Sequence, residues 1–377
     1  MDERRGSTDW GAHLARMVEG IERRVDAAIG VLPWRAGAPD PIAAFVFNGF
    51  GTAERVRIMG RVLEVDHMTP SGAGDPRWRN FFAAIGRFES DEIPDARVRL
   101  SYGDSTLDAV TDEEGYFTAW LPGTAPDDTG SGWRRVSAEL LEPAGLAGEG
   151  RVLVPRPDTR LGIISDLDDT VIRTGVRRLL RMLAATFLEN ARTRLPFPGV
   201  ASFYQALHAG TTGGPPAPIF YVSSSPWNLH NFLLEFLEVR GIPTGPLLLR
   251  DWGLSRETFL PRGHHSHKSD AIELIFRTYP DLPFILIGDS GQQDPEIYSR
   301  MARRHPGRVA AIYIRDVTAN PIRAAEVRDL AAEVESLGSR MLLIEDTLAA
   351  ARHAAEHGWI APERVAGVEE EIRLSED

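Results

Sequence analysis

Apolar and polar positions follow two different patterns along this chain of 377 residues. In the first part, short segments alternate between apolar and polar residues, which is typical of half-buried β-strands. The clearest case is residues 96–102, where Ala96, Val98, Leu100 and Tyr102 fall on one face. We therefore predict strands at residues 42–47, 55–65, 96–102, 116–121 and 133–141.

Spaced short strands with turn signals between them predict a mainly-β sandwich domain over residues 41–155. The polar segment from Thr111 to Gly115 supplies one such turn. Around it, residues 110–117 resemble the small β-sandwich domains similar to transthyretin. Apolar residues at helical spacing over 9–29 predict a leading helix, so residues 1–40 are expected to form an N-terminal helical segment. Residues 70–90 are expected to form a loop with a short helix.

A last strand of the β domain is expected to stop near Pro155–Pro157, and beyond this boundary uninterrupted apolar runs alternate with helical patterns. This alternation predicts a parallel sheet with helices on both faces, and therefore a three-layer α/β domain over residues 156–377. Ligands of such sheets bind at the carboxyl ends of the strands. The expected strands are residues 161–165, 218–222, 246–249, 283–287, 309–314 and 340–344.

Two aspartates with one residue between them follow the first of these strands, in the sequence Asp166-Leu167-Asp168-Asp169-Thr170. The strand end holds Asp166 at the ligand edge, and the turn after it brings Asp168 round to the same side. One carboxylate can then attack a phosphorus atom while the other transfers a proton. This D-x-D-x-T pattern, with Thr170 as its last member, predicts a phosphoryl-transfer site.

Hydroxyl groups follow the next apolar strand, at Ser223, Ser224 and Ser225. We expect Ser223 or Ser224 to donate a hydrogen bond to a phosphate oxygen. Ser225 is expected to cap a helix instead, because Pro226 follows it at what would be the first helical position.

A lysine, Lys268, opens the helix that carries Ile272, Ile275 and Phe276. A cation is unfavourable at the amino end of a helix, so its position there favours a specific anionic partner. The neighbouring histidines lack a second group at zinc-ligand spacing. We therefore expect His267 to contact a phosphate or head group rather than a metal.

The fourth strand of this kind ends in Gly288-Asp289-Ser290-Gly291-Gln292-Gln293-Asp294. Magnesium prefers hard oxygen ligands and keeps several of its waters. Asp166, Asp289 and a backbone carbonyl are sufficient for it, with Asp294 acting directly or through water and Asp168 in the same metal site. The sequence thus predicts Mg²⁺ as the cofactor.

The order of these four motifs resembles the haloacid dehalogenase (HAD) superfamily of aspartate-based phosphatases. Within it, residues from about 160 to 320 are similar to the catalytic domain of the actin-patch-associated phosphatidate phosphatases, distant relatives of the lipins. The resemblance implies Asp166 as nucleophile, Asp168 as acid and base, Ser223 and Lys268 as phosphate binders, and Asp289 with Asp294 on the magnesium side. The matching stretches are Asp166-Leu167-Asp168-Asp169-Thr170-Val171-Ile172-Arg173-Thr174-Gly175, Arg194-Leu195-Pro196-Phe197-Pro198-Gly199-Val200, Tyr221-Val222-Ser223-Ser224-Ser225-Pro226-Trp227-Asn228-Leu229 and Gly288-Asp289-Ser290-Gly291-Gln292-Gln293-Asp294-Pro295-Glu296-Ile297-Tyr298.

The segment between the first two motifs is rich in arginine and leucine. Residues 173–194 contain six arginines and one glutamate, in a chain of net charge −12. A basic amphipathic helix is typical of a membrane-surface or anionic-ligand element. We expect Arg177, Arg178 and Arg181 to bind the head group of a phosphatidate substrate. The alternative is a solvated arginine face on a helix packed against the core.

Composition limits the other functions. The net charge of −12 argues against a nucleic-acid partner, because the field of the whole molecule repels phosphate. The absence of cysteine suits a reducing compartment. The amino-terminal residues lack the apolar core of a secretory signal, and no apolar run approaches the roughly 20 residues that span a bilayer. We expect a cytoplasmic protein whose only membrane contact is peripheral.

Three alternatives to a phosphatidate phosphatase remain at this point. A phosphatase for a soluble phosphomonoester shares every catalytic residue and differs only in the segment of residues 173–194. A phosphorylated signalling receiver does not need Asp168, because its phosphoaspartate must persist. A non-enzymatic lipid or protein adaptor would tolerate the loss of Asp166 or Asp168, and both are present.

Overall fold

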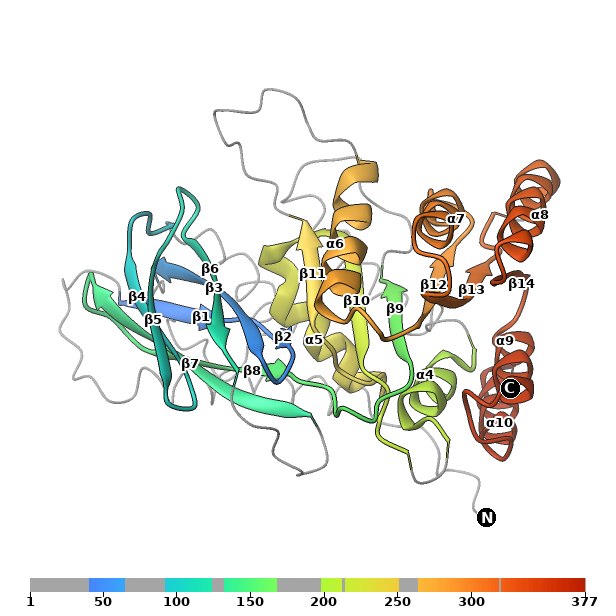
Figure 1. Ribbon diagram of the computed structural model, residues 1–377, viewed down its shortest axis with the longest axis horizontal. Helices are drawn as coiled ribbons and strands as arrows, with labels where there is room; N and C mark the ends of the chain where they lie inside the picture. The colour runs from blue at the N-terminus through green and yellow to red at the C-terminus, as the bar shows by residue number, and fades with distance from the viewer. Residues whose placement is uncertain are drawn as a thin grey trace, which may run out of the picture.

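The computed structural model describes residues 41–64, 92–123, 132–167, 198–211, 214–250, 264–318 and 320–376. They form a mainly-β part and an α/β part, side by side in Figure 1. The predicted leading helix and the predicted loop and helix at residues 70–90 lie outside the described residues.

The β part is a single mixed sheet of eight strands. Its strands are joined in the order β1-β3-β2-β8-β7-β4-β5, and β6 pairs with the other side of β3. Only β2 and β8 pair in parallel among these strands. The strands are β1 (Ile42–Val46), β2 (Gly49–Gly51), β3 (Arg55–Glu64), β4 (Arg97–Tyr102), β5 (Ser105–Val110), β6 (Tyr116–Pro122), β7 (Trp133–Glu142) and β8 (Gly148–Leu153).

The alternation seen in the sequence forms the core of this part. Val98 and Leu100 are completely buried, whereas Arg97 and Arg99 beside them are exposed. The five strands predicted with residue ranges are confirmed, β8 is the last strand expected to stop near Pro155, and β2 and β5 were missed. The two missed strands give no periodic signal: β2 is Gly-Phe-Gly, and β5 is an edge strand with little buried surface.

The α/β part contains a six-stranded parallel sheet in the order β11-β10-β9-β12-β13-β14. All six predicted strands are present, within a few residues of the expected bounds. They are β9 (Gly162–Asp166), β10 (Ile219–Pro226), β11 (Leu247–Arg250), β12 (Phe284–Asp289), β13 (Val309–Arg315) and β14 (Arg340–Ile344).

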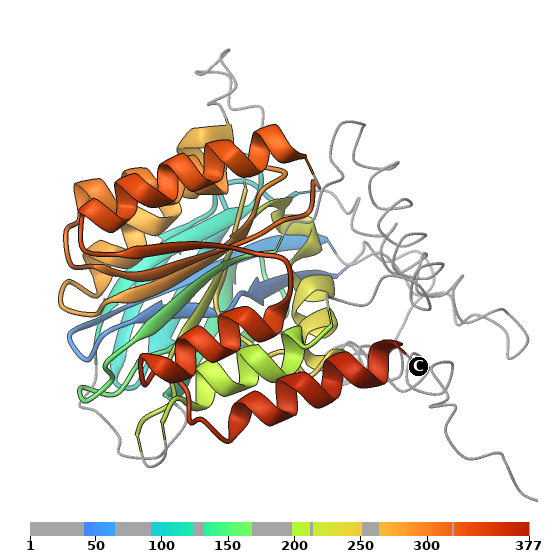
Figure 2. The ribbon, with the colours of Figure 1, turned by 90° about the vertical axis from the view of Figure 1, so that its right-hand side faces the viewer.

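Helices cover both faces of this sheet, as the sequence predicted. Successive strand residues point to opposite faces, so Ile164 packs with α6, α7 and α8 while Ile163 packs with α4, α5, α9 and α10. Figure 2 shows α8 on one side of the sheet and α4, α9 and α10 on the other. The helices are α4 (Val200–Ala209), α5 (His230–Val239), α6 (His264–Thr278), α7 (Asp294–Arg304), α8 (Pro321–Ser336), α9 (Thr347–Glu356) and α10 (Arg364–Glu376), with a 3₁₀ turn η2 (Trp227–Leu229) before α5.

The β part and the α/β part share apolar contacts. Phe50 of β2 is 1% exposed and packs edge-on against Phe220 of β10, with ring centroids 5.6 Å apart. Phe47 stacks on Trp227, which directly follows β10, with centroids 4.8 Å apart. The core is therefore continuous across the boundary predicted near Pro155.

Candidate active site

Three neighbouring strands end at the same edge of the parallel sheet. Asp166 is the last residue of β9 and lies opposite Val222 of β10. Asp289 is the last residue of β12, which pairs with β9 on its other side. This register brings Asp166, Asp289 and the residues after Val222 together, although Asp289 follows Asp166 by 123 positions in the sequence. The predicted ligand edge of the sheet is therefore where these side chains meet.

Lys268 lies at the centre of the group. Its Nζ is 2.9 Å from Oδ1 of Asp166 and 2.7 Å from Oδ1 of Asp294. Nζ also donates a hydrogen bond of 3.2 Å to Oε1 of Gln292. The side chains of Lys268 and Asp166 are each 4% exposed, and that of Asp294 is fully buried. The anionic partner expected for Lys268 in the sequence is thus a pair of carboxylates.

The loop between β12 and α7 holds the other two carboxylates. Oδ1 of Asp289 accepts hydrogen bonds from the backbone N–H groups of Gly291 and Gln292, at 2.7 and 3.0 Å. Oδ2 of Asp294 accepts one from the backbone N–H of Asp289, at 3.2 Å. Asp294 is also the first residue of α7 and precedes Pro295. A negative charge and a proline in the first turn both favour the start of a helix.

Gly288 makes this arrangement possible. A Cβ atom at residue 288 would lie 2.4 Å from Oδ2 and 2.7 Å from Cβ of Asp294. Any larger residue would therefore push Asp294 away from Lys268.

Burial and charge shift the acid–base properties of the group. Burial, reinforced by the negative charge of Asp294, raises the pKa of Asp289 to about 6. Burial disfavours the charged form of Lys268, but the carboxylates of Asp166 and Asp294 outweigh it and raise its pKa above the usual range. Lys268 therefore stays a cation at neutral pH, and Asp289 is close to its titration point.

The donor set fits a divalent cation. Asp166, Asp289 and Asp294 each offer a carboxylate oxygen, and these three oxygens lie within 4.8 Å of one another. Carboxylates are the hard ligands that Mg²⁺ prefers. A cation there would also offset the charge repulsion that raises the pKa of Asp289.

The serines lie at the same edge, with one difference from prediction. Strand β10 continues through Pro226, and α5 starts only at His230, so Ser225 does not cap a helix. That prediction was wrong, because the strand pairing with β11 extends to Pro226. Instead, Oγ of Ser223 accepts a hydrogen bond of 2.9 Å from the backbone N–H of Ser225. Ser223 is fully buried and Ser224 is half-buried.

His267 contacts backbone atoms beside the site. Its Nε2 lies 3.4 Å from the carbonyl oxygen of Leu248. Burial lowers the pKa of His267, so its ring is neutral at neutral pH. Its predicted contact with a phosphate stays a prediction.

Several predicted site residues lie outside the described residues. They are Asp168, Thr170, Arg177, Arg178 and Arg181.

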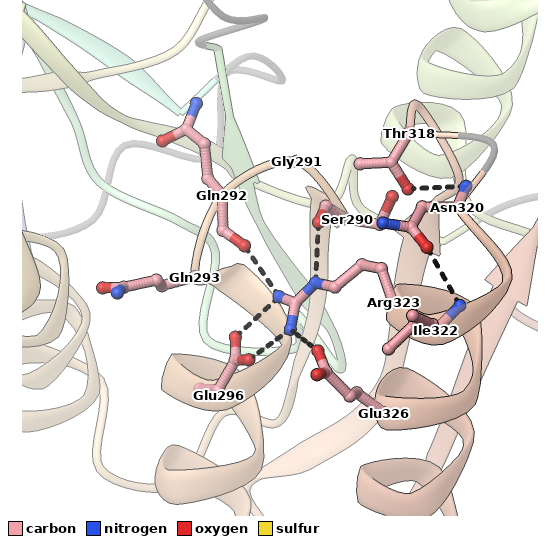
Figure 3. A pocket seen from close by; sticks show the side chains of 10 residues that line it. All are labelled: Ser290, Gly291, Gln292, Gln293, Glu296, Thr318, Asn320, Ile322, Arg323 and Glu326. Atoms are coloured by element: carbon pink, nitrogen blue, oxygen red, sulfur yellow. Dashed lines mark hydrogen bonds and ion pairs between the residues drawn. The ribbon is translucent and has the colours of Figure 1, made fainter.

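Two residues near the site were not singled out from the sequence. Gln292 contacts Lys268, and its place within the motif of residues 288–294 was the signal for it. Arg323 of α8 binds the same loop from the other side, and no local pattern indicates it. Together with the loop, Arg323 lines a pocket of about 430 Å³, and none of Asp166, Asp289 and Asp294 is part of its lining (Figure 3).

Comparison with known proteins identifies this region. Residues 161–316 match the family model described as Phosphatidate phosphatase APP1, catalytic domain. This range includes Asp166, Ser223, Lys268, Asp289 and Asp294. The resemblance predicted from the motifs is confirmed over this range.

Two fungal proteins match over the same length of chain. Phosphatidate phosphatase APP1 of Saccharomyces cerevisiae is 32% identical over 156 residues, which are 41% of this chain and 26% of the yeast protein. An uncharacterized protein of Schizosaccharomyces pombe is 31% identical over 159 residues, which are 42% of this chain and 25% of that protein. The chain thus matches about a quarter of each relative.

A solved structure of a carbohydrate acetylesterase from Xanthomonas citri aligns with a TM-score of 0.26 and 11% identity, covering 80% of this chain and 75% of that one. A score this low does not establish a common fold.

Proposed function

We propose that the α/β part is a Mg²⁺-dependent phosphatidate phosphatase that releases inorganic phosphate and diacylglycerol. The observation that carries this proposal is the buried group around Lys268, in which one ammonium bridges Asp166 and Asp294 beside Asp289. The APP1-type catalytic domain over residues 161–316 supports the substrate class. The name of the yeast relative supports phosphatidate as the substrate.

The same observations support a HAD-like architecture for this part. Its parallel sheet has helices on both faces, and Asp166, Ser223 and Asp289 come from the carboxyl ends of adjacent strands. We propose three units: a helical segment of residues 1–40, a β-sandwich of residues 41–155 and the catalytic domain of residues 156–377. The single apolar core formed by the residues of the mixed sheet supports a separate unit for residues 41–155.

The proposed reaction has two steps. A carboxylate oxygen of Asp166 attacks phosphorus in line, and the bond to the alkoxide leaving group breaks as Asp168 protonates that alkoxide. Asp168 then takes a proton from water, whose oxygen attacks phosphorus and releases Asp166 and inorganic phosphate. Asp168 gives one proton to the alkoxide and takes one from water, so it ends in the protonated form in which it began.

The other residues hold the phosphoryl group. Lys268 stays charged and lies within 2.9 Å of the proposed nucleophile, so it offsets negative charge on the phosphate oxygens. Ser223 or Ser224 donates to one of those oxygens, and the Thr170 hydroxyl completes the D-x-D-x-T motif. Mg²⁺, held by Asp166, Asp168 and Asp289 with Asp294 directly or through water, supplies further charge neutralisation when bound.

The test is phosphate release from phosphatidate in mixed micelles and from soluble phosphomonoesters, with and without Mg²⁺. We expect Asp166→Asn to abolish release, because the amide keeps the shape but removes the nucleophile. Asp158→Asn is the control, since Asp158 is an exposed carboxylate paired with Arg156. Activity that survives in Asp166→Asn or in excess chelator would contradict the mechanism. Equal or better turnover of soluble esters would assign the enzyme to a soluble phosphomonoester instead.

The described helices include none that is long and apolar enough to cross a bilayer. We propose peripheral contact with a membrane through the arginines of residues 173–194, with Arg177, Arg178, Arg181 and His267 at the head group.

A further inference from the structure

A single arginine outside the matched motifs holds the loop that orients Asp289. Arg323 lies in the first turn of α8, and its Nε donates a hydrogen bond of 2.9 Å to the carbonyl oxygen of Ser290. Its Nη2 donates one of 2.8 Å to the carbonyl oxygen of Gln292. One guanidinium therefore spans two carbonyl groups of the β12–α7 loop (Figure 3).

Backbone N–H groups of the same loop bind Asp289. The peptide group between Ser290 and Gly291 gives its carbonyl to Arg323 and its N–H to Oδ1 of Asp289. The N–H of Gln292 also donates to this Oδ1. Because a peptide group is rigid and planar, fixing the carbonyl fixes the direction of the N–H. The orientation of the Asp289 carboxylate thus depends on Arg323.

Two glutamates hold the guanidinium itself. Glu296 of α7 accepts from Nη1 and Nη2 at 2.5 and 3.0 Å, and Glu326 accepts from Nη1 at 3.0 Å. The Arg323 side chain is only 17% exposed. A two-pronged contact of this kind needs the planar fork of arginine, which lysine cannot reproduce.

The loop also carries the contact with Lys268. Oε1 of Gln292 accepts from Nζ of Lys268, and the carbonyl of the same residue accepts from Arg323. We propose that Arg323 is a positioning residue: its bond to the Ser290 and Gln292 carbonyls holds Asp289 and Gln292 in the geometry that binds the divalent cation. This proposal rests on the metal role given to Asp289 under the proposed function.

The first test measures the loop without metal or substrate. Hydrogen–deuterium exchange of the peptide covering residues 288–294 is followed in the metal-free protein, for wild type, Arg323→Met, Arg323→Lys and Arg328→Met. Arg328 is an exposed residue of the same helix and serves as the control. We expect exchange in this peptide to be about tenfold or more faster in both Arg323 variants, with the strands β9 and β10 unchanged. Exchange equal to wild type would overturn the proposal.

The second test measures the metal. Mn²⁺ is titrated into the same four proteins, and free Mn²⁺ is read by electron paramagnetic resonance. Loss of a residue that orients a metal ligand typically costs about 10- to 100-fold in metal affinity, so we expect a shift of this size in both Arg323 variants and none in Arg328→Met. Arg323→Lys keeps a positive charge at residue 323 and is the variant more certain to stay folded. Full recovery of affinity by lysine would show that charge alone matters and would overturn the role of the fork.

The two tests separate this inference from the proposed function. One outcome is that wild type binds Mn²⁺ and the Arg323 variants lose affinity while no phosphate is released from any ester. In that case the positioning role of Arg323 is supported and the phosphatase assignment fails. If wild type is an active phosphatase and Mn²⁺ affinity is the same in all four proteins, the positioning role of Arg323 is wrong and the phosphatase assignment is supported.

Discussion

Single side chains in the site are held by more than one partner each. Lys268 pairs with Asp166 and Asp294, and Asp289 accepts from two backbone N–H groups. Such a buried network is stable only when every member is satisfied. Small changes at one residue should therefore alter metal binding more than they alter the rest of the fold.

The raised pKa of Asp289 predicts how the metal-free protein responds to pH. The folded protein binds a proton here with a pKa of about 6, whereas an unfolded aspartate has a pKa of about 4. By linkage, this group favours the folded state at low pH, and that stability is lost as the pH rises from about 4 through 6. We expect the free energy of unfolding by urea to fall across this window by on the order of 2 kcal/mol more in wild type than in Asp289→Asn.

Mg²⁺ should reverse the effect at pH 7, because it replaces the missing proton as the partner of the carboxylate. Parallel pH profiles of wild type and Asp289→Asn in the metal-free state would contradict this account.

Gly288 leaves the space that Asp294 occupies. We expect Gly288→Ala to reduce Mg²⁺ affinity by about 10-fold or more, because its Cβ would displace Asp294 and release Lys268. Gly367→Ala is a matched control. No heavy atom lies within 4 Å of a Cβ at residue 367 in α10, so alanine there should leave metal binding unchanged and stabilise the helix by about 1 kcal/mol. Calorimetric titration with Mg²⁺ measures the affinities, and equal values in the two variants would show that Asp294 adjusts freely.

At the scale of elements, the site depends on where strands end. The carboxyl ends of β9, β10 and β12 are adjacent, and α6 and α7 add Lys268 and Asp294 to the same edge. The strands supply a rigid frame, while the loops beyond them are free to differ in sequence. Substrate choice should therefore depend on segments such as residues 173–194 rather than on the sheet.

The arginines of residues 173–194 are expected to bind an anionic membrane. An anionic membrane attracts a nearby basic residue by about 1 kcal/mol, and the attraction is screened within a Debye length. Replacing Arg177, Arg178 and Arg181 with Gln should weaken binding to phosphatidate vesicles by up to roughly 100-fold, while hydrolysis of a soluble ester continues. Added salt should have the same effect on wild type. Vesicle sedimentation and phosphate release measure the two quantities.

Replacing Arg303, Arg328 and Arg352 with Gln is the control, because these are exposed arginines of α7, α8 and α9. Equal loss of both activities in the first variant would mean that its arginines support the fold or the phosphate site. No change in either activity would leave a solvated helix face as the correct description.

At the scale of the whole molecule, the β part and the α/β part are not independent in stability. Phe50 packs against Phe220 and Tyr279, and Leu153 belongs to the same apolar cluster as Ile164. Phe47 stacks on Trp227 and lies 4.4 Å from the ring of His230, close to the end of the strand that carries Ser223. The β part therefore contributes packing to the domain that holds the site.

We expect Phe50→Ala to lower the free energy of unfolding by about 3–5 kcal/mol, because a fully buried ring is lost at this junction. Leu107→Ala, at a partly exposed residue of β5, should change it by about 0.5 kcal/mol or less. Urea unfolding followed by tryptophan fluorescence measures both. A small effect of Phe50→Ala would show that the two parts fold separately.

The sequence alone determined the strands with a clear period and the chemistry at their ends. Uninterrupted apolar runs predicted all six parallel strands. The residues after them predicted Asp166, Asp289 and Asp294 as one site, and the start of a helix added Lys268 to it. These signals are local, since strand periodicity and motif spacing are properties of a few consecutive residues. Strands without an apolar face, such as β5, and the continuation of β10 past Ser225 have no such signal.

Only the tertiary structure decided which partners those residues have. It showed that Lys268 bridges two carboxylates, that Gly288 leaves room for Asp294, and that Arg323 holds the loop 29 or more residues before it in the chain. It also showed that Phe50 completes the apolar core of the α/β part. Contacts of this kind depend on the order of strands in the sheet and on side-chain packing, which distant residues settle together and no single segment encodes.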